Sequence, residues 1–390
     1  MATPKLPTVT KITGLPVPSD ASSKSHHLLS KTGKLVGFRN THDSFNNKYD
    51  GSTILPAAFK LLTDRVRGKL GPMPPIPSPC PIPVRKPTFI TTRIGPSALR
   101  ATWLGHACYF LEFPSGLRVL FDPVFEEICA PTSLLSSKRF TPVPCSIADL
   151  PFLDAVVISH SHFDHLSHPT VQEITKHHPT AHFFVPLGLQ AWFRKQGITN
   201  VTELDWWEDA ELTVPADEAT IRGTFSCLPA QHSSGRSGFD KDTTLWASWA
   251  VSSTLFSSDT KKSVYFGGDT GYRAVPEDIK GDDYLPHLPT NPDFGKIGTL
   301  RGPFTLGLLP IGAYRPRYLM SSVHANPFDA VEIFRDTRCE KAMGIHWGTW
   351  QLTFEDVMEP PVLLREALAR RGLPERGVFD ICDVGESREF

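Results

Sequence analysis

The sequence predicts an α/β fold with one large domain at residues 97–390, which follows an N-terminal extension at residues 1–96. Three observations support this prediction. From residue 98 onward, apolar segments of strand length alternate with amphipathic segments of helical period. Several of the apolar segments end in a polar cluster that contains His or Asp. The extension has neither pattern, because it is polar at first and then dominated by proline.

The extension changes character along its length. Residues 15–50 are rich in Ser, Lys, Asn, His and Gly, and few apolar residues there are in phase. Apolar residues recur at helical spacing in 54–70, which predicts one short amphipathic helix. Eight prolines follow within residues 71–87, and this density excludes a helix or a central strand. We therefore expect an arm that wraps the main domain and is partly irregular.

The main domain is expected to be a series of strands with a few helices between them. A strand, a turn and a second strand are predicted within residues 98–113. Further strands are predicted within residues 117–125, 153–166, 181–188, 200–207, 219–232, 244–253, 262–271, 304–313 and 342–348, the last being the final core strand. Helices are predicted at residues 190–197, 326–336 and 361–371. At roughly 150 residues per domain the length would allow two or three domains, but this uninterrupted series favours one.

Composition excludes several classes of protein. The 40 basic and 41 acidic residues leave a net charge of −1, which argues against a nucleic-acid partner. The seven cysteines have scattered spacing and no CxxC, which argues against a disulfide framework and indicates a reducing compartment. No apolar run reaches 18 residues, and residues 1–30 have no signal-peptide core. We expect an intracellular protein, cytoplasmic or peripheral on internal membranes. The oligomeric state stays open, a homodimer included.

The strongest motif is His160-Ser161-His162-Phe163-Asp164-His165, directly after a buried apolar strand. Imidazole and carboxylate are the ligands that zinc takes when thiolates are absent. A strand sends residues 160 and 162 to the same face, and a turn can aim Asp164 and His165 at a second position. The spacing therefore suits two metal ions about 3.5–4 Å apart. The alternative is a polar loop of solvated histidines, which this dense spacing disfavours.

Three more candidate ligands stand at the ends of predicted strands. They are His232, Asp269 and His346. Gly267 and Gly268 precede Asp269 and allow the backbone to approach its neighbours closely. Each of the three alone would more often be a hydrogen-bonded structural residue, but together with the HxHxDH motif they indicate one metal centre. Asp122, after another strand, is a good carboxylate to orient a ligand imidazole from behind, and His106 has a similar or a purely structural role.

The order HxHxDH, His, Asp, His resembles the ligand order of the metallo-β-lactamase superfamily. Within that superfamily the chain resembles the N-acylphosphatidylethanolamine-hydrolysing phospholipase D family from about residue 97 to residue 390. The motifs that carry the resemblance lie at residues 101–106, 119–125, 137–140, 185–189, 203–208, 229–232, 266–272, 310–317, 345–349, 359–361 and 385–388. In the extension only residues 37–40 are similar to a family segment, Phe-x-Asn-Pro-Trp-Pro. Here Thr41-His42-Asp43 replace its last three residues, so the resemblance does not fix how this arm docks.

The resemblance implies a metallo-β-lactamase αββα four-layer sandwich with two Zn²⁺ per chain. It places one zinc on His160, His162 and His232, the second on Asp164, His165 and His346, and Asp269 between them. Asp164 and His324 are the residues expected to be catalytic, with His324 near the substrate phosphate. The family often has Gln before this histidine, whereas this chain has Val323.

The activity implied is hydrolysis of N-acylphosphatidylethanolamine to N-acylethanolamine and phosphatidic acid, by attack of a metal-bridging hydroxide on phosphorus. The substrate is a phospholipid, so contact with a membrane surface is expected. Leu134, Leu135 and Phe140 flank Lys138-Arg139 and suit an anionic lipid surface. Arg315 and Arg317 are candidates for contact with phosphate. Two alternatives stay open: a hydrolase of another phosphodiester or a lactone, and a lipid-binding relative without activity.

Overall fold

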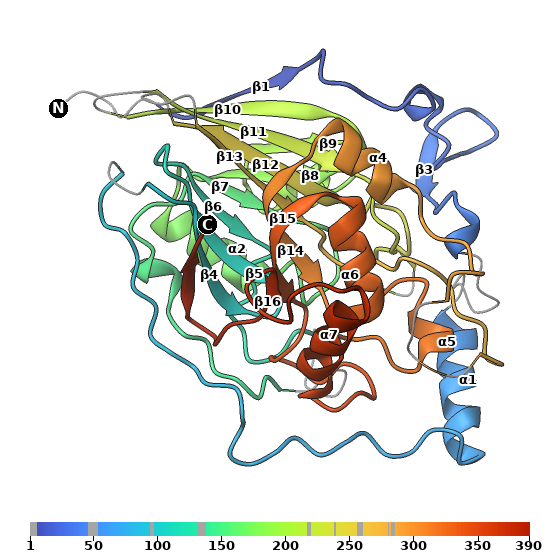
Figure 1. The fold of residues 1–390 in the computed structure, drawn as a ribbon. Coiled ribbons are helices and arrows are strands. Elements are labelled where there is room, and N and C mark those ends of the chain that lie inside the picture. The colour runs from blue at the N-terminus through green and yellow to red at the C-terminus, as the bar shows by residue number, and fades with distance from the viewer. Residues whose placement is uncertain are drawn as a thin grey trace.

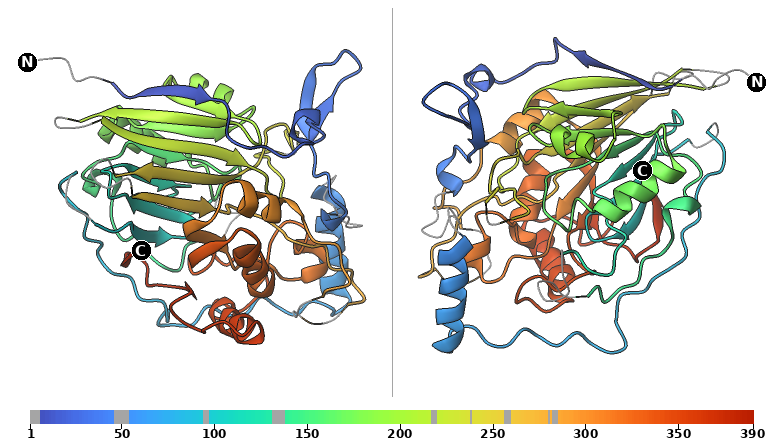
Figure 2. Two further views of the ribbon diagram at one scale, coloured as in Figure 1. Left: turned by 45° about the horizontal axis from the view of Figure 1, so that its top comes forward. Right: turned by 180° about the vertical axis from the view of Figure 1, so that it is seen from behind.

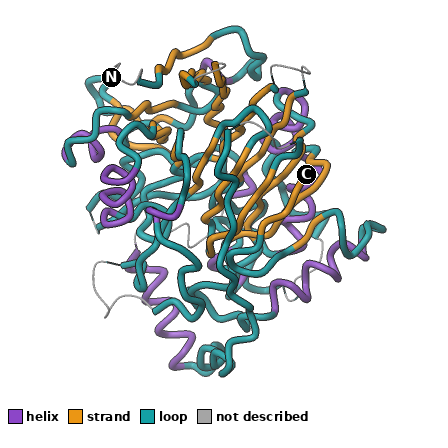
Figure 3. The backbone as a smooth tube through the Cα atoms, turned by 90° about the vertical axis from the view of Figure 1, so that its left-hand side faces the viewer, coloured by secondary structure: helices purple, strands orange, loops and turns teal. Residues whose placement is uncertain are grey.

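Two β-sheets pack face to face, with helices on the outer face of each sheet (Figure 1). This computed structural model describes residues 6–45, 54–93, 97–130, 138–216, 220–237, 239–255, 260–279, 281 and 285–390. The arrangement is the αββα sandwich that the resemblance implies. The strands lie together in the middle, and most helices lie at the periphery (Figure 3). Within the described residues, no helix is long and apolar enough to cross a membrane.

In spatial order, the eight-stranded sheet contains β1 (Thr8–Ile12), β10 (Asp209–Pro215), β11 (Thr220–Leu228), β12 (Ser248–Thr254), β13 (Lys261–Phe266), β14 (Phe304–Pro310), β15 (Cys339–Ile345) and β16 (Phe379–Asp380). The seven-stranded sheet contains β17 (Ser387–Glu389), β4 (Arg100–Gly105), β5 (Cys108–Glu112), β6 (Arg118–Phe121), β7 (Ala155–Val157), β8 (His182–Pro186) and β9 (Val201–Leu204). A separate hairpin consists of β2 (His27–Leu29) and β3 (Leu35–Phe38). The helices are α1 (Ile54–Val66), α2 (His168–His177), α3 (Gln190–Lys195), α4 (Asp293–Leu300), α5 (Arg317–Met320), α6 (Pro327–Asp336) and α7 (Glu359–Arg370).

The central strands β5, β6 and β7 of the seven-stranded sheet are buried on both faces. In β5, Tyr109 and Leu111 belong to the core between the two sheets, whereas Phe110 belongs to the core under α2 and α3. Such strands read as continuous apolar runs and not as alternating ones. On the opposite side, α4, α6 and α7 cover the eight-stranded sheet and contribute Phe294 and Phe328 to the central core.

The predicted strands and helices of the main domain are all present, but several elements lack a signal in the sequence. β10, α2, α4 and α5 were not predicted, and neither were the strands β1, β2 and β3 of the extension. The short strands β16 and β17 also follow residues 342–348, so that segment is not the last strand of the sheets. Most of these elements are short, and they form because neighbouring strands or helices supply their pairing and burial.

The N-terminal arm docks on the main domain through specific contacts. β1 pairs antiparallel with β10 and forms the edge of the eight-stranded sheet (Figure 2). Asn40 donates from Nδ2 to the main-chain oxygen of His232 (2.7 Å). His42 lies 2.8 Å from a carboxylate oxygen of Asp293. The replacement of the family's Pro-Trp-Pro by Thr41-His42-Asp43 therefore does not prevent docking, because His42 and its neighbours make polar contacts of their own.

Two glycines of α4 offer a matched test of helix packing. At Gly298 a Cβ would collide with the main-chain oxygen of Asp336 at the end of α6, whereas at Gly295 it would meet nothing within 4 Å. We expect Gly298→Ala to lower the free energy of unfolding by about 1–3 kcal/mol through overpacking. Gly295→Ala should raise it by about 0.5–1 kcal/mol. Thermal or urea denaturation measures both, and equal effects would contradict this packing.

Candidate active site

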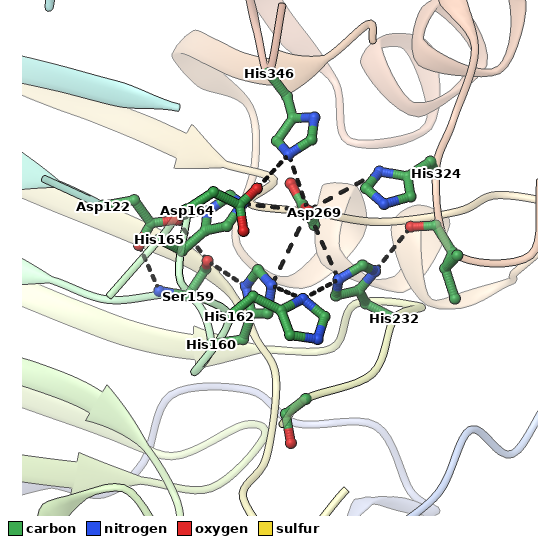
Figure 4. Close-up of polar contacts among 12 residues, drawn as sticks. Asp122, Ser159, His160, His162, Asp164, His165, His232, Asp269, His324 and His346 are labelled. Atoms are coloured by element: carbon green, nitrogen blue, oxygen red, sulfur yellow. Dashed lines mark hydrogen bonds and ion pairs between the residues drawn. The ribbon is translucent and has the colours of Figure 1, made fainter. Parts of the chain in front are cut away.

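The predicted ligands meet at one edge of the sandwich, where strands from both sheets end. The segment after β7 carries the HxHxDH motif, and the ends of β11, β13 and β15 lead to His232, Asp269 and His346. Figure 4 shows these side chains converging from both sheets. The carboxyl ends of parallel strands are where α/β folds commonly place their sites. His162 and Asp164 are partly exposed, so the centre can be reached from solvent.

A first ligand set consists of His160, His162 and His232. His162 Nδ1 lies 2.8 Å from His160 Nε2 and 3.3 Å from His232 Nε2. Three imidazole nitrogens that face one another at such distances have the spacing of ligands around one ion, because zinc–nitrogen bonds are about 2.0–2.1 Å long. This set can hold one metal ion.

A second ligand set consists of Asp164, His165 and His346. Asp164 Oδ2 lies 3.3 Å from His165 Nε2 and 3.4 Å from His346 Nε2. His106 Nε2 also approaches this oxygen, at 3.1 Å. The second set can therefore hold another ion, with His106 positioned to fix the orientation of the Asp164 carboxylate.

Asp269 lies between the two ligand sets. Its Oδ2 atom is 3.2 Å from His165 Nε2 and 3.1 Å from His346 Nε2. The same oxygen is 3.6 Å from His232 Nε2 and 4.0 Å from His160 Nε2, in the first set. One carboxylate thus contacts both sets, which is the position of a bridging ligand.

Several buried atoms of this centre lack a hydrogen-bond partner. Nε2 of His165 and of His346 and Oδ1 of Asp269 are fully buried and make no hydrogen bond, although the two nitrogens lie 3.2 and 3.1 Å from Asp269 Oδ2. Buried polar atoms are almost always satisfied in proteins, and unpaired imidazole nitrogens and carboxylate oxygens are the donor atoms of zinc sites. The residues present therefore fit metal ions as the missing partners.

The electrostatics of the centre favour bound cations. Burial opposes ionisation of Asp269, but the charges of His165 and His346 hold its pKa well below the ordinary value. Burial likewise lowers the pKa of His346, yet the charge of Asp269 outweighs it and raises that pKa to about 9. Asp164 also has a pKa well below its ordinary value, against the effect of burial, because of His165 and His106. Two ionised carboxylates inside a buried pocket attract positive charge.

Asp122 holds two ligand histidines from behind. Its carboxylate accepts from Nδ1 of His165 (2.7 Å), and it also accepts from the main-chain N–H and the hydroxyl of Ser159 (2.7 and 2.5 Å). The Ser159 hydroxyl in turn lies 2.9 Å from His160 Nδ1. Such contacts fix the tautomer of each imidazole and leave Nε2 for the metal. The sequence predicted Asp122 in this role but missed Ser159.

The other ligands are also held by main-chain contacts. His232 Nδ1 lies 2.9 Å from the main-chain oxygen of Val323, so the absence of Gln at this position leaves that contact intact. Arg236 donates to the main-chain oxygens of Ser161 and Leu166 (2.9 and 2.6 Å) and clamps the HxHxDH loop. Arg236 was not predicted, because only the folded loop brings it to those carbonyl groups.

Backbone strain is concentrated at this site. Three residues of the site have positive φ, in the left-handed region that residues other than glycine rarely adopt. The φ values are 37° for Asp122, 52° for His106 and 61° for His346. Gly268 has φ of 56°, and a Cβ there would lie 2.7 Å from Ser159 Cβ, so the predicted need for glycine before Asp269 is met at this position. Strained residues of this kind cluster at functional sites because the surrounding structure holds them there.

His324 lies beside the centre. Its Nδ1 atom is buried and unpaired, 3.9 Å from Asp269 Oδ2, and its ring centroid is 5.1 Å from that of His232. Burial lowers the pKa of His324 to about 4. Arg315 and Arg317, the candidates for contact with phosphate, pair with Glu359 (2.8 Å) and Asp329 (2.5 Å), and their contact with phosphate stays a prediction.

The loop expected to meet lipid cannot be placed as a whole. Leu134 and Leu135 lie outside the described residues. Lys138 pairs with Glu127 at 3.1 Å, and the Arg139 guanidinium lies 4.8 Å from the centre of the Trp350 ring. Contact of this loop with a membrane stays a prediction.

Comparison with known proteins agrees with this geometry. Residues 117–347 match the family model described as a beta-lactamase superfamily domain. The chain is 40% identical over 297 residues to N-acyl-phosphatidylethanolamine-hydrolyzing phospholipase D 1 of Caenorhabditis elegans, a match that covers 74% of this chain and 75% of that protein. This chain belongs to the N-acylphosphatidylethanolamine-hydrolysing phospholipase D family. It is a metal-dependent hydrolase of the phospholipase D type.

Other relatives of this phospholipase D family member agree. The mitochondrial N-acyl-phosphatidylethanolamine-hydrolyzing phospholipase D of Saccharomyces cerevisiae is 32% identical over 293 residues, or 74% of this chain and 55% of the yeast protein. The structure titled "a possible metal-dependent hydrolase" from Veillonella parvula aligns with a TM-score of 0.51 at 15% identity, over 75% of this chain and all of that one. The second match shows the shared fold alone.

The structure of this family member brings together the predicted ligands and the residues expected to support them. The seven predicted ligands, Asp122, His106 and His324 all lie in or against one centre. Which of them bind metal stays a prediction.

The Asp122 contacts generate a test of how the ligands are oriented. We expect Asp122→Asn to weaken metal affinity by about 10–100-fold, because removal of an orienting carboxylate has this effect on histidine ligands. The metal affinity is measured from the metal that each variant retains after dialysis against increasing concentrations of a chelator. Asp383→Asn, which changes a carboxylate paired with the exposed Arg85, is the control. Equal metal retention in the two variants would contradict the orienting role.

Proposed function

We propose that this chain is a zinc-dependent phosphodiesterase that hydrolyses N-acylphosphatidylethanolamine to N-acylethanolamine and phosphatidic acid. The observation that supports it best is the pair of ligand sets on either side of Asp269, in a chain 40% identical to a phospholipase of that stated activity. The substrate, the metal and its number are our inference from this combination.

The charge of the centre favours an anionic substrate. The proposed ligands are five imidazoles, which are neutral when they bind a metal, and the two carboxylates Asp164 and Asp269. With two zinc ions bound, the centre would carry a net charge of about +2. A phosphodiester is an anion, whereas an ester or a lactone is neutral, so the charge favours a phosphodiester. Zinc, when bound, supplies activation of water and stabilisation of the charge that develops on phosphate oxygens.

The chain's own residues orient this chemistry. Asp122, through His165 and Ser159, keeps the ligand imidazoles fixed. His324 presents a buried, unpaired ring nitrogen on the side of Asp269. We place this imidazole at the substrate phosphate, where it donates a hydrogen bond or assists protonation of the leaving group. Asp164 and His162 are partly exposed, whereas the other ligands are buried, so these two face the arriving substrate.

A paired measurement of metal and turnover tests the proposal. The full chain is purified, its zinc is counted, and release of N-acylethanolamine from N-acylphosphatidylethanolamine in mixed micelles is followed. We expect about two zinc ions per chain at the two catalytic ligand sets. His162→Ala should lose zinc and turnover together, because it removes a ligand of the first set. His324→Gln should keep its zinc and lose about 10²–10⁴-fold in turnover, the usual contribution of a proton-transferring group.

The outcomes separate the substrate from the site. Two zinc ions without release of N-acylethanolamine would retain the metal centre and overturn the substrate, and other phosphodiesters and lactones would then be assayed. Full turnover by His324→Gln would overturn the role given to that histidine. His177→Gln is the control for loss of an imidazole, because His177 lies on the surface of α2 beside Glu173.

A further inference from the structure

A second cluster of metal-ligating side chains lies away from the catalytic centre. His26 precedes β2, His27 begins it, and Asp205 follows β9. His26 Nε2 is 2.7 Å from Asp205 Oδ1, and His27 Nε2 is 2.9 Å from Asp205 Oδ2. The ligand atoms of all three residues lie within 4.8 Å of one another. The cluster joins the N-terminal hairpin to the edge of the seven-stranded sheet.

We propose that His26, His27 and Asp205 form a separate structural site for a zinc-class divalent cation. Two imidazoles and one carboxylate are a ligand set that zinc accepts in tetrahedral coordination, with water in the fourth position. Both imidazole Nε2 atoms face the same carboxylate, one on each of its oxygens, at hydrogen-bond distances of 2.7 and 2.9 Å. All three ligand atoms lie within 4.8 Å of one another, so one ion could contact all of them after small shifts.

The ligands are held in place before any ion arrives. The His26 ring stacks on Trp206 at a centroid distance of 4.3 Å, and the main-chain N–H of Trp206 donates to Asp205 Oδ1 (2.8 Å). His26 and Asp205 are buried, with 5% and 3% of their surface exposed. Buried, stacked and hydrogen-bonded ligands lose little freedom on binding, which is what a structural metal site requires.

A cavity beside the cluster gives an ion and its water access. It has a volume of about 440 Å³ and is lined by His26 together with the carboxylate residues Asp20 and Asp293. The cations Lys24, Arg39 and Lys296 also line this cavity, so its wall carries both signs of charge. Lys296 pairs with Asp20 and with Asp293, at 3.1 Å in each case, so part of their negative charge is offset.

Lys24 competes for the same carboxylate. Its Nζ atom lies 2.9 Å from Asp205 Oδ2, and its side chain is 33% exposed. A flexible, half-exposed ammonium can move into solvent when a dication arrives, because its hydration compensates the lost ion pair. Lys24 therefore sets the affinity of the site: it occupies Asp205 when metal is scarce and is displaced when metal is abundant.

Binding at this cluster would fix the arm that touches the catalytic centre. His27 pairs with Phe38 across the hairpin, and Asn40, two residues further on, donates to the main-chain oxygen of His232. His232 belongs to the first ligand set of the catalytic centre. An ion on His26, His27 and Asp205 thus secures the hairpin from which Asn40 reaches that ligand.

Zinc content per chain tests the inference. The full chain and variants are equilibrated with excess ZnCl₂, freed of unbound metal by gel filtration, and analysed by elemental mass spectrometry. We expect His27→Gln to hold one zinc fewer than the unmodified chain. Lys24→Gln should keep that zinc and release it to chelators more slowly, since the competing cation is gone. His177→Gln is the matched control and should lose no zinc.

The difference between variants makes this test independent of the catalytic zinc count and of the proposed substrate. His162→Ala should lose catalytic zinc but keep the ion at His27. As a second measurement, added ZnCl₂ should raise the melting temperature of His162→Ala more than that of the double variant His162→Ala/His27→Gln. Equal zinc content in His27→Gln and the unmodified chain, with equal shifts in melting temperature, would overturn the inference and leave a hydrogen-bonded cluster.

Discussion

The arrangement of the whole site depends on the Asp269 carboxylate. One oxygen of this side chain lies 3.1–3.6 Å from three ligand imidazoles that belong to both ligand sets. Burial of a carboxylate costs free energy unless nearby groups compensate its charge. The second oxygen of Asp269 has no hydrogen-bond partner among the described protein atoms. The two sheets must therefore meet so that strand ends from each supply the compensating groups. Glycine at 268 allows this approach, because any side chain there would strike Ser159.

The cluster of candidate metal ligands could be predicted from the sequence because its members give local signals. The HxHxDH motif lies within six residues, and each of the other candidate ligands follows an apolar strand. The hydrophobic pattern and the positions of the strand ends therefore indicate them. Asp122 was also predictable, since it ends a strand in Asp-Pro. Resemblance to a known family then supplied what spacing cannot, the assignment of ligands to two ions and a substrate class. The fold followed from the same strand series, and the αββα layers confirm it.

The rest could not be predicted, because it depends on contacts between distant segments. Asn40 reaches His232 across 192 residues of sequence, and Arg236 clamps carbonyl groups about 70 residues away. β1 is only five residues long and has no clear strand pattern in the sequence. It forms because it pairs with β10. The carboxylate partners of Arg315 and Arg317 lie on α7 and α6, respectively, and nothing in the sequence indicates these pairs. An arginine-rich segment does not reveal which acids will neutralise it.

The central claim is that Asp269 joins two metal ions in one centre. Anomalous diffraction from crystals of the zinc-loaded chain, recorded on both sides of the zinc absorption edge, tests it most directly. At the catalytic centre we predict two anomalous peaks about 3.5–4 Å apart, one within bonding distance of His160, His162 and His232 and the other of Asp164, His165 and His346, with Asp269 between them. A single peak at either set, or two peaks with Asp269 bound to only one of them, would contradict it.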